Sequence, residues 1–100
     1  MNNGGAVLAR PAGPLTFATV TGVLGDIVSL LTPVPSSLVV DLSQVTHTDS
    51  AGIALLLELK RQTSALTCEL RLQDAPNQLA ELARFFEVDA PLQLPPASPR

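Results

Sequence analysis

A buried strand, a short loop and an unusually apolar helix, all within residues 39–59, constrain the fold more than any other part of the chain. This segment reads VVDLSQVTHTDSAGIALLLEL. Asp49 and Ser50 stand where the helix is predicted to begin, and both residue types favour the N-terminal cap of a helix. The chain is then apolar from Ala51 to Leu57. A helix of this kind must bury one side, which predicts that it packs on a sheet.

Predicted strands alternate with predicted helices along the rest of the chain, which favours an α/β fold with helices packed on a mixed sheet of four to five strands. The turn signal PAGP at 11–14 predicts a hairpin between the segments on either side of it. Strands are predicted over 6–10, 15–21, 36–42 and 66–73, with a connection over 43–48. Helices are predicted over 23–32, over 50–63 and from Pro76 onward, the last with core residues Leu79, Leu82, Ala83 and Phe86.

The chain of 100 residues corresponds to one domain. We expect this domain to span residues 6–90, with flexible tails at 1–5 and 91–100. Hydrophobic residues make up 46% of the sequence, which is enough for one core built mainly from aliphatic side chains. Cys68 is the only cysteine, so we expect a small buried core residue and neither an intrachain disulfide nor a cysteine-based metal site.

The helix predicted over 50–63 has two apolar sides. Steps of about 100° per residue place one stripe of five residues in a single arc, as a sheet-facing side requires. That stripe consists of Gly52, Leu55, Leu56, Leu59 and Thr63. The opposite side carries Ile53, Ala54 and Leu57 together with Lys60 and Arg61. Either another helix of the chain covers this second side, or it is an exposed apolar patch of the kind that binds a partner protein.

Charge and hydropathy exclude several classes of function. The net charge is −3 and the six basic residues are scattered, whereas a nucleic-acid or anionic-lipid surface needs a basic cluster. The longest apolar run, Ile53–Leu57, is far shorter than the roughly 20 residues of a membrane span. The start of the chain has no basic and apolar leader pattern. We therefore expect a cytoplasmic protein without membrane insertion.

The sequence also argues against an enzyme. His47, Asp49 and Ser50 are the residue types of a hydrolase triad, but they lie within four positions of one another. A nucleophile and its base must converge in space with a third orienting group, and no second polar segment supplies one. A single histidine without neighbouring ligands is a poor metal site. Asp41 is predicted to bind backbone N–H groups of the following loop. We expect no catalysis, no cofactor and no metal.

The motif DLSQV at 41–45, followed after three residues by DSAGIALL at 49–56, resembles the core motif of the STAS domain family, the anti-anti-sigma factors and their relatives. The resemblance covers about residues 6–90. It implies a STAS fold. In one branch of that family the domain antagonises a GHKL-type anti-sigma kinase, which phosphorylates the serine matching Ser50. In another, MlaB-like branch it is the small STAS subunit of the Mla phospholipid transporter.

Two segments favour the transporter branch. AGIALLLEL at 51–59 and LARFFEVDAPL at 82–92 are similar to the central and final helices of that subunit. The resemblance then implies a subunit that binds and supports the ATPase of an ABC transporter maintaining outer-membrane lipid asymmetry. Such a subunit lies at the inner membrane through its partner. The implied interface comprises Asp49, Ser50, Ala51, Ile53, Ala54, Leu57, Lys60 and Arg61. Phosphorylation of Ser50 as an anti-sigma switch is the alternative.

Asp49 and Ser50 have two interpretations. They can simply cap the helix by binding its free N–H groups. Alternatively, Ser50 lies in a partner interface, where a phosphate adds close to two negative charges. A helix N-terminus tolerates such charge, but adjacent Asp49 and an apolar partner surface do not. Phosphorylation is then expected to block docking without unfolding the domain.

Overall fold

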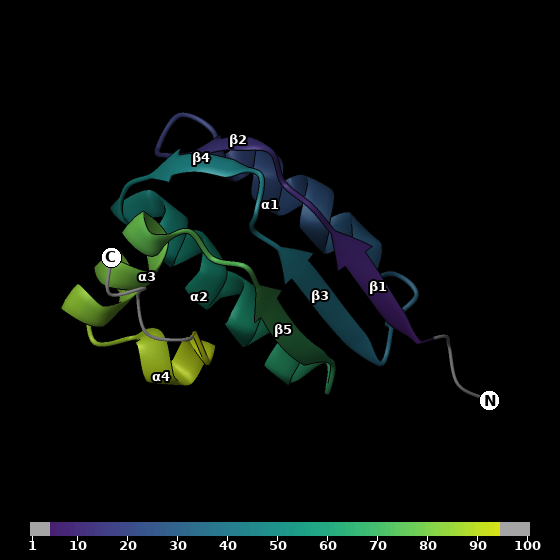
Figure 1. Cartoon of the computed structure of the whole chain (residues 1–100). Helices are drawn as coiled ribbons and strands as arrows, with labels where there is room; N and C mark the ends of the chain where they lie inside the picture. The colour runs from purple at the N-terminus through teal and green to yellow at the C-terminus, as the bar shows by residue number, and fades with distance from the viewer. Residues whose placement is uncertain (1–4, 95–100) are drawn as a thin grey trace.

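Parallel strand pairing organises the computed structural model, which describes residues 5–94 (Figure 1). In chain order its elements are β1 (Ala6–Ala9), β2 (Gly13–Leu15), α1 (Val20–Val28), the 3-10 turn η1 (Ser29–Leu31), β3 (Ser37–Asp41), β4 (Val45–Thr48), α2 (Ser50–Ala65), β5 (Glu69–Gln73), α3 (Asn77–Phe85) and α4 (Asp89–Leu92). The predicted α/β class is therefore confirmed. In this described part of the chain the strands form two sheets instead of the single mixed sheet expected.

The larger sheet has the strand order β1-β3-β5, and both of its pairs are parallel. Strands β2 and β4 form a second, two-stranded parallel pair. The predicted hairpin between the first two strands is thus wrong, because each of them pairs with a strand that follows α1. The segment 43–48, predicted to be a connection, instead contains the strand β4.

The predicted strand over 15–21 is also wrong, because the chain turns into a helix after Leu15. Thr19 holds this turn: its hydroxyl accepts a hydrogen bond from the Thr16 N–H at 2.9 Å and donates to the Pro14 carbonyl at 2.8 Å. Threonine hydroxyls that bind nearby backbone groups compete with strand formation. Helix α1 then begins at Val20, three residues before the predicted start.

Helices α1 and α2 lie on one face of the larger sheet, behind the strands in the view of Figure 1, whereas α3 and α4 pack against α2. On that face four side chains are fully buried between the sheet and the helix: Leu38 and Val40 of the central strand β3, and Leu56 and Leu59 of α2. These residues belong to one continuous hydrophobic core. Cys68 is part of that core, as expected, and burial raises the pKa of its thiol. The other face of the sheet remains open, and Leu8 on β1 is 53% exposed there.

The C-terminal part of the core differs from the sequence prediction. Phe86, expected in the core, is 46% exposed, because α3 ends at Phe85 and Phe86 lies just outside the helix. Leu92 and Leu94 are buried instead, so the packed domain continues past residue 90 as far as the described chain reaches. The rest of the expected tails, residues 1–4 and 95–100, lies outside the described residues. Between residues 5 and 94 no helix has the length and apolar composition that crossing a membrane requires.

Candidate functional site

The N-terminal end of α2 places the predicted acid–hydroxyl pair at the surface. Asp49 is the N-cap, and its carboxylate accepts the Ala51 N–H at 2.8 Å. Its second oxygen accepts the Phe17 N–H at 3.2 Å, which ties the loop before α1 to the start of α2. Ser50 is exposed, and within residues 5–94 its hydroxyl has no hydrogen-bond partner. Capping therefore falls to Asp49, and the Ser50 hydroxyl is free for another contact.

Thr48 fixes the backbone just before this helix. Its N–H donates to the side-chain oxygen of Gln78 on α3 at 3.0 Å, and its hydroxyl donates to the Leu15 carbonyl at 2.9 Å. The Asp49 N–H donates to the same Leu15 carbonyl at 3.2 Å. Because β2, β4 and α3 all hold this point, Ser50 is presented on a rigid support. Sequence reasoning missed the contribution of Gln78, which lies 30 residues away in the chain.

Fewer apolar side chains are exposed on the outer side of α2 than the helical pattern predicted. Ala54 is exposed and Leu57 is 36% exposed, as expected for a partner surface. Ile53, however, is only 3% exposed and belongs to the core, so its predicted place in the interface is wrong for the free chain. The reason is that α1 and α3 both pack against α2 and cover its flanks. Ala51, also predicted for the interface, is half-buried.

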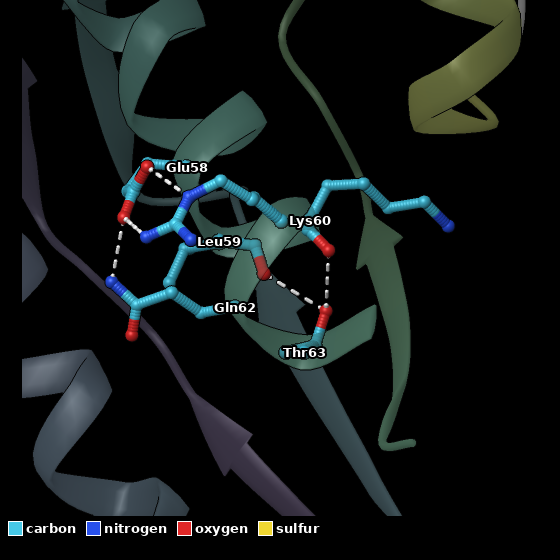
Figure 2. Close-up of polar contacts among 6 residues, drawn as sticks. Glu58, Leu59, Lys60, Gln62 and Thr63 are labelled. Atoms are coloured by element: carbon cyan, nitrogen blue, oxygen red, sulfur yellow. Dashed lines mark hydrogen bonds and ion pairs between the residues drawn. The ribbon is translucent and has the colours of Figure 1, made fainter. Parts of the chain in front are cut away.

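The charged residues at the far end of this face interact with one another. The Arg61 guanidinium donates to Glu58 through Nε at 3.0 Å, and the Gln62 amide donates to the same carboxylate at 2.8 Å (Figure 2). The bond from Arg61 lowers the pKa of Glu58 to about 2, with a further contribution from Gln62. The Lys60 side chain extends away from this cluster in Figure 2. Thus Arg61 is paired with Glu58 of the same helix, whereas the Lys60 side chain extends away from that pair.

A shallow groove of about 200 Å³ runs between α1 and α2, and it begins on α2 at Ala51, the residue after Ser50. Val20, Thr21 and Leu24 line it from α1, and Ala51, Ala54, Leu55 and Glu58 line it from α2. The loop that Asp49 ties to α2 carries Phe17, whose side chain is 86% exposed, three residues before the groove residue Val20. Sequence reasoning placed Phe17 in a strand and missed it as a surface residue. The Thr16–Thr19 spacing before a helix was the signal that could have identified the turn.

The loop after β3 is held as the sequence predicted. Asp41 accepts the Ser43 N–H at 2.9 Å and the Arg10 Nε–H at 2.9 Å. These bonds hold the pKa of Asp41 below its ordinary value of 3.8, and the bond from the Ser43 backbone makes the largest contribution. Asp41 is therefore a structural residue that fixes the approach to β4.

A pH dependence of stability follows from Asp41. Because its pKa is lower in the folded chain than in the unfolded chain, ionised Asp41 stabilises the fold above pH 4 or so. That contribution is lost as the pH falls through the lowered value. We expect Asp41→Asn to flatten the decline of the free energy of unfolding between about pH 5 and pH 2, as measured by urea unfolding. Asp26→Asn is the control, since no hydrogen bond involves the Asp26 carboxylate in residues 5–94. Equal acid sensitivity of the wild type and Asp41→Asn would contradict this account.

The arrangement offers little chemistry of its own. In the described residues no hydrogen bond joins Ser50 to His47, which lies exposed on β4. The Asp49 carboxylate is occupied by two backbone N–H groups, so it orients no histidine. Across residues 5–94 no group of three or more potential metal ligands comes together. What the site presents is an exposed hydroxyl at a helix end, one residue before Ala51, which lines an apolar groove.

Comparison with known proteins identifies the class of domain and then the family. The fold and the site define an α/β domain in which a parallel sheet carries helices on one face and an acid–hydroxyl pair is exposed at the start of α2. The chain belongs to the STAS domain family: the family model described as "Mlab, STAS domain" matches residues 6–95. No curated protein matches the chain.

Solved structures share the fold at low sequence identity. A sulfate transporter family protein from Wolinella succinogenes matches with a TM-score of 0.75 and 18% identity, covering 88% of this chain and 71% of that one. A structure titled Mglu matches with a TM-score of 0.62 and 24% identity, covering 74% of this chain but only 18% of that protein. These likenesses concern the fold alone.

Proposed function

We propose that this chain is the non-catalytic STAS subunit of an ABC-type phospholipid transporter of the Mla kind, where it binds and supports the cytoplasmic ATPase. Its location would then be cytoplasmic, at the inner membrane through that partner. The match of the MlaB-like family model over residues 6–95 supports this choice of branch. The observation that carries the proposal is the exposed Ser50 hydroxyl, which has no partner within residues 5–94 and directly precedes Ala51 of the α1–α2 groove.

The proposed docking surface, named here the α1–α2 surface, consists of Phe17, Val20, Leu24, Ser50, Ala54 and Leu57. Its centre is apolar, and its edge carries the Glu58–Arg61 ion pair and Lys60. An apolar centre with a polar rim is the usual composition of a protein interface. Phe17 is a suitable anchor, because its ring is exposed while its backbone is already fixed by Asp49. A residue held in advance loses little conformational entropy on binding.

Capture of the tagged full chain from detergent-solubilised native cells, followed by mass spectrometry, tests the function. Recovery of an ABC ATPase with its permease is the expected result. The alternative function is an anti-sigma antagonist switched at Ser50, and the exposed hydroxyl also suits a kinase. Recovery of a soluble GHKL-type kinase, with phosphate on Ser50, would favour that alternative and contradict the transporter proposal.

Leu57→Asp and Ser50→Asp are each expected to weaken capture of the ATPase at least about tenfold while the chain stays folded. A carboxylate placed against an apolar partner surface loses its hydration without a compensating bond, and about 1.4 kcal/mol already corresponds to tenfold. The measurement is affinity of the purified variants for the captured ATPase. Ser64→Asp is the matched control: Ser64 is an exposed residue of the same helix, about 21 Å from Ser50 along its axis. Equal loss for Ser64→Asp would contradict the assignment of the surface.

A further inference from the structure

A second surface lies on the opposite flank of α1 and shares no residue with the α1–α2 surface. It is a groove of about 450 Å³ between the edge strand β1 and helix α1. One wall is the continuous segment 8–12, and the other wall consists of Val23, Asp26, Ile27 and Leu30. The geometry points to a peptide-binding groove that takes an extended segment of another protein as an added strand on β1.

The edge of β1 is the first argument. Strand β1 pairs with β3 on one side, and no other strand in residues 5–94 pairs with its outer side. In a parallel pair every second residue directs its N–H and C=O groups away from the partner strand. Water satisfies such groups in the free chain, and an extended backbone can replace that water with a matching row of hydrogen bonds. An added strand is a known mode of peptide recognition.

The two edges of the sheet differ in protection. The other edge strand, β5, carries Glu69 and Arg71, whose exposed side chains form an ion pair at 3.2 Å. Charged residues on an edge hinder pairing with another chain. Strand β1 has the sequence AVLA and carries no charge, and Leu8 within it is 53% exposed. Arg10 follows directly and lines the groove; its side chain is 55% exposed, but its charge is paired with Asp41 at 2.9 Å.

The groove beside this edge defines the chemistry of the occupant. Val23, Ile27 and Leu30 offer an apolar wall, which suits an aliphatic side chain. At the rim stands the Asp26 carboxylate, which accepts no hydrogen bond and forms no ion pair with residues 5–94. A basic side chain of the occupant complements it. We therefore assign the groove to an extended segment with one or two aliphatic residues flanked by lysine or arginine.

The probe that tests this assignment is a fluorescein-labelled peptide of sequence Ser-Lys-Val-Leu-Val-Lys-Ser, titrated with the full chain and followed by fluorescence polarisation. We expect saturable binding, with slowed amide hydrogen exchange in Ala6–Ala9. Peptides N-methylated at alternate positions keep the side chains but lack backbone donors. Of the two N-methylated peptides, one is expected to bind at least about tenfold more weakly than the unmethylated peptide, since it loses two or more backbone hydrogen bonds to β1. Equal binding by both N-methylated peptides would overturn the proposal.

Two variants of the chain locate the binding. Leu8→Lys places a charge on the open face of the edge strand β1 and is expected to abolish peptide binding, whereas Leu66→Lys, at another exposed leucine, is expected to leave it unchanged. Asp26→Lys is expected to weaken the basic peptide about two- to fivefold and to favour a peptide with glutamates in place of its lysines. Unchanged preference for the basic peptide would contradict the role of Asp26.

Other occupants give distinct results. If the outer amides of β1 are protected in the free chain at micromolar concentration, the edge is already covered by this chain and the proposal is overturned. If that protection grows with protein concentration along with a dimer in sedimentation, a second copy is the occupant, which also contradicts the proposal. Absence of peptide binding up to millimolar concentration overturns it as well.

Discussion

Leu56→Asp is expected to leave the chain unfolded at 25 °C. The Leu56 side chain is 0% exposed and lies at the centre of the hydrophobic core between α2 and the sheet. A carboxylate there would be buried without a partner, a change that costs more than about 4 kcal/mol. Loss of the leucine's packing costs about 2–5 kcal/mol more. Together the two costs reach the range of about 5–15 kcal/mol that is the total stability of a domain of this size. Circular dichroism and urea unfolding of the purified variant measure the effect.

Leu57→Asp is the matched comparison, because it introduces the same charge one residue further along the same helix. Leu57 is 36% exposed, so the new carboxylate remains hydrated. We expect a folded variant whose free energy of unfolding lies within about 1 kcal/mol of the wild type. A cooperative, folded Leu56→Asp, or an unfolded Leu57→Asp, would show that the two sides of α2 are assigned wrongly.

The same helix shows what the sequence could and could not predict. Helical spacing separated Leu56 from Leu57 correctly, because the widest apolar stripe faces the sheet. It failed for Ile53, which lies on the flank of α2. Whether a flank is covered depends on neighbouring helices, and α1 and α3 come from distant parts of the sequence. Spacing within one helix carries no information about them.

Strand pairing was the least predictable part of the fold. The turn signal between the first two strands was real, but the chain there crosses from one sheet to the other without forming a hairpin. Strand β2 is only three residues long, and its pairing with β4 depends on residues 45–48. Such short strands lack the period-two pattern that makes longer ones recognisable. The local polar contacts at Thr16 and Thr19 then overrode the apolar alternation over 15–21.

The geometry at the start of α2 was predicted better than the topology because its motif is local. Asp49 caps α2 and Ser50 is exposed, both of which follow from residue types at a helix start. Phe17 and Gln78, which extend and support the site, could not be found in this way. Both reach the site only through tertiary contacts: Phe17 lies 32 positions from Asp49, and Gln78 lies 30 positions from Thr48.

Gly52→Ala is expected to destabilise the fold by about 1–3 kcal/mol, although alanine is the better helix former by about 1 kcal/mol. A Cβ atom at Gly52 would overlap the Thr48 hydroxyl oxygen and would lie 3.0 Å from the Leu15 carbonyl oxygen. Thr48 would have to move, which breaks its bond to that carbonyl and disturbs the start of α2. The measurement is urea unfolding of the purified variant.

Gly25→Ala is the control for this prediction, because Gly25 lies within α1 and a Cβ atom there meets nothing within 4 Å. It is expected to stabilise the chain by about 0.5–1 kcal/mol through helix propensity alone. The double variant Thr48→Ala/Gly52→Ala removes the overlapping hydroxyl. It should therefore cost less than the sum of its single changes, since the two residues are in contact. Additive costs would mean that Gly52 is needed for a reason other than its closeness to Thr48, and the glycine would then no longer explain how Ser50 is held in position.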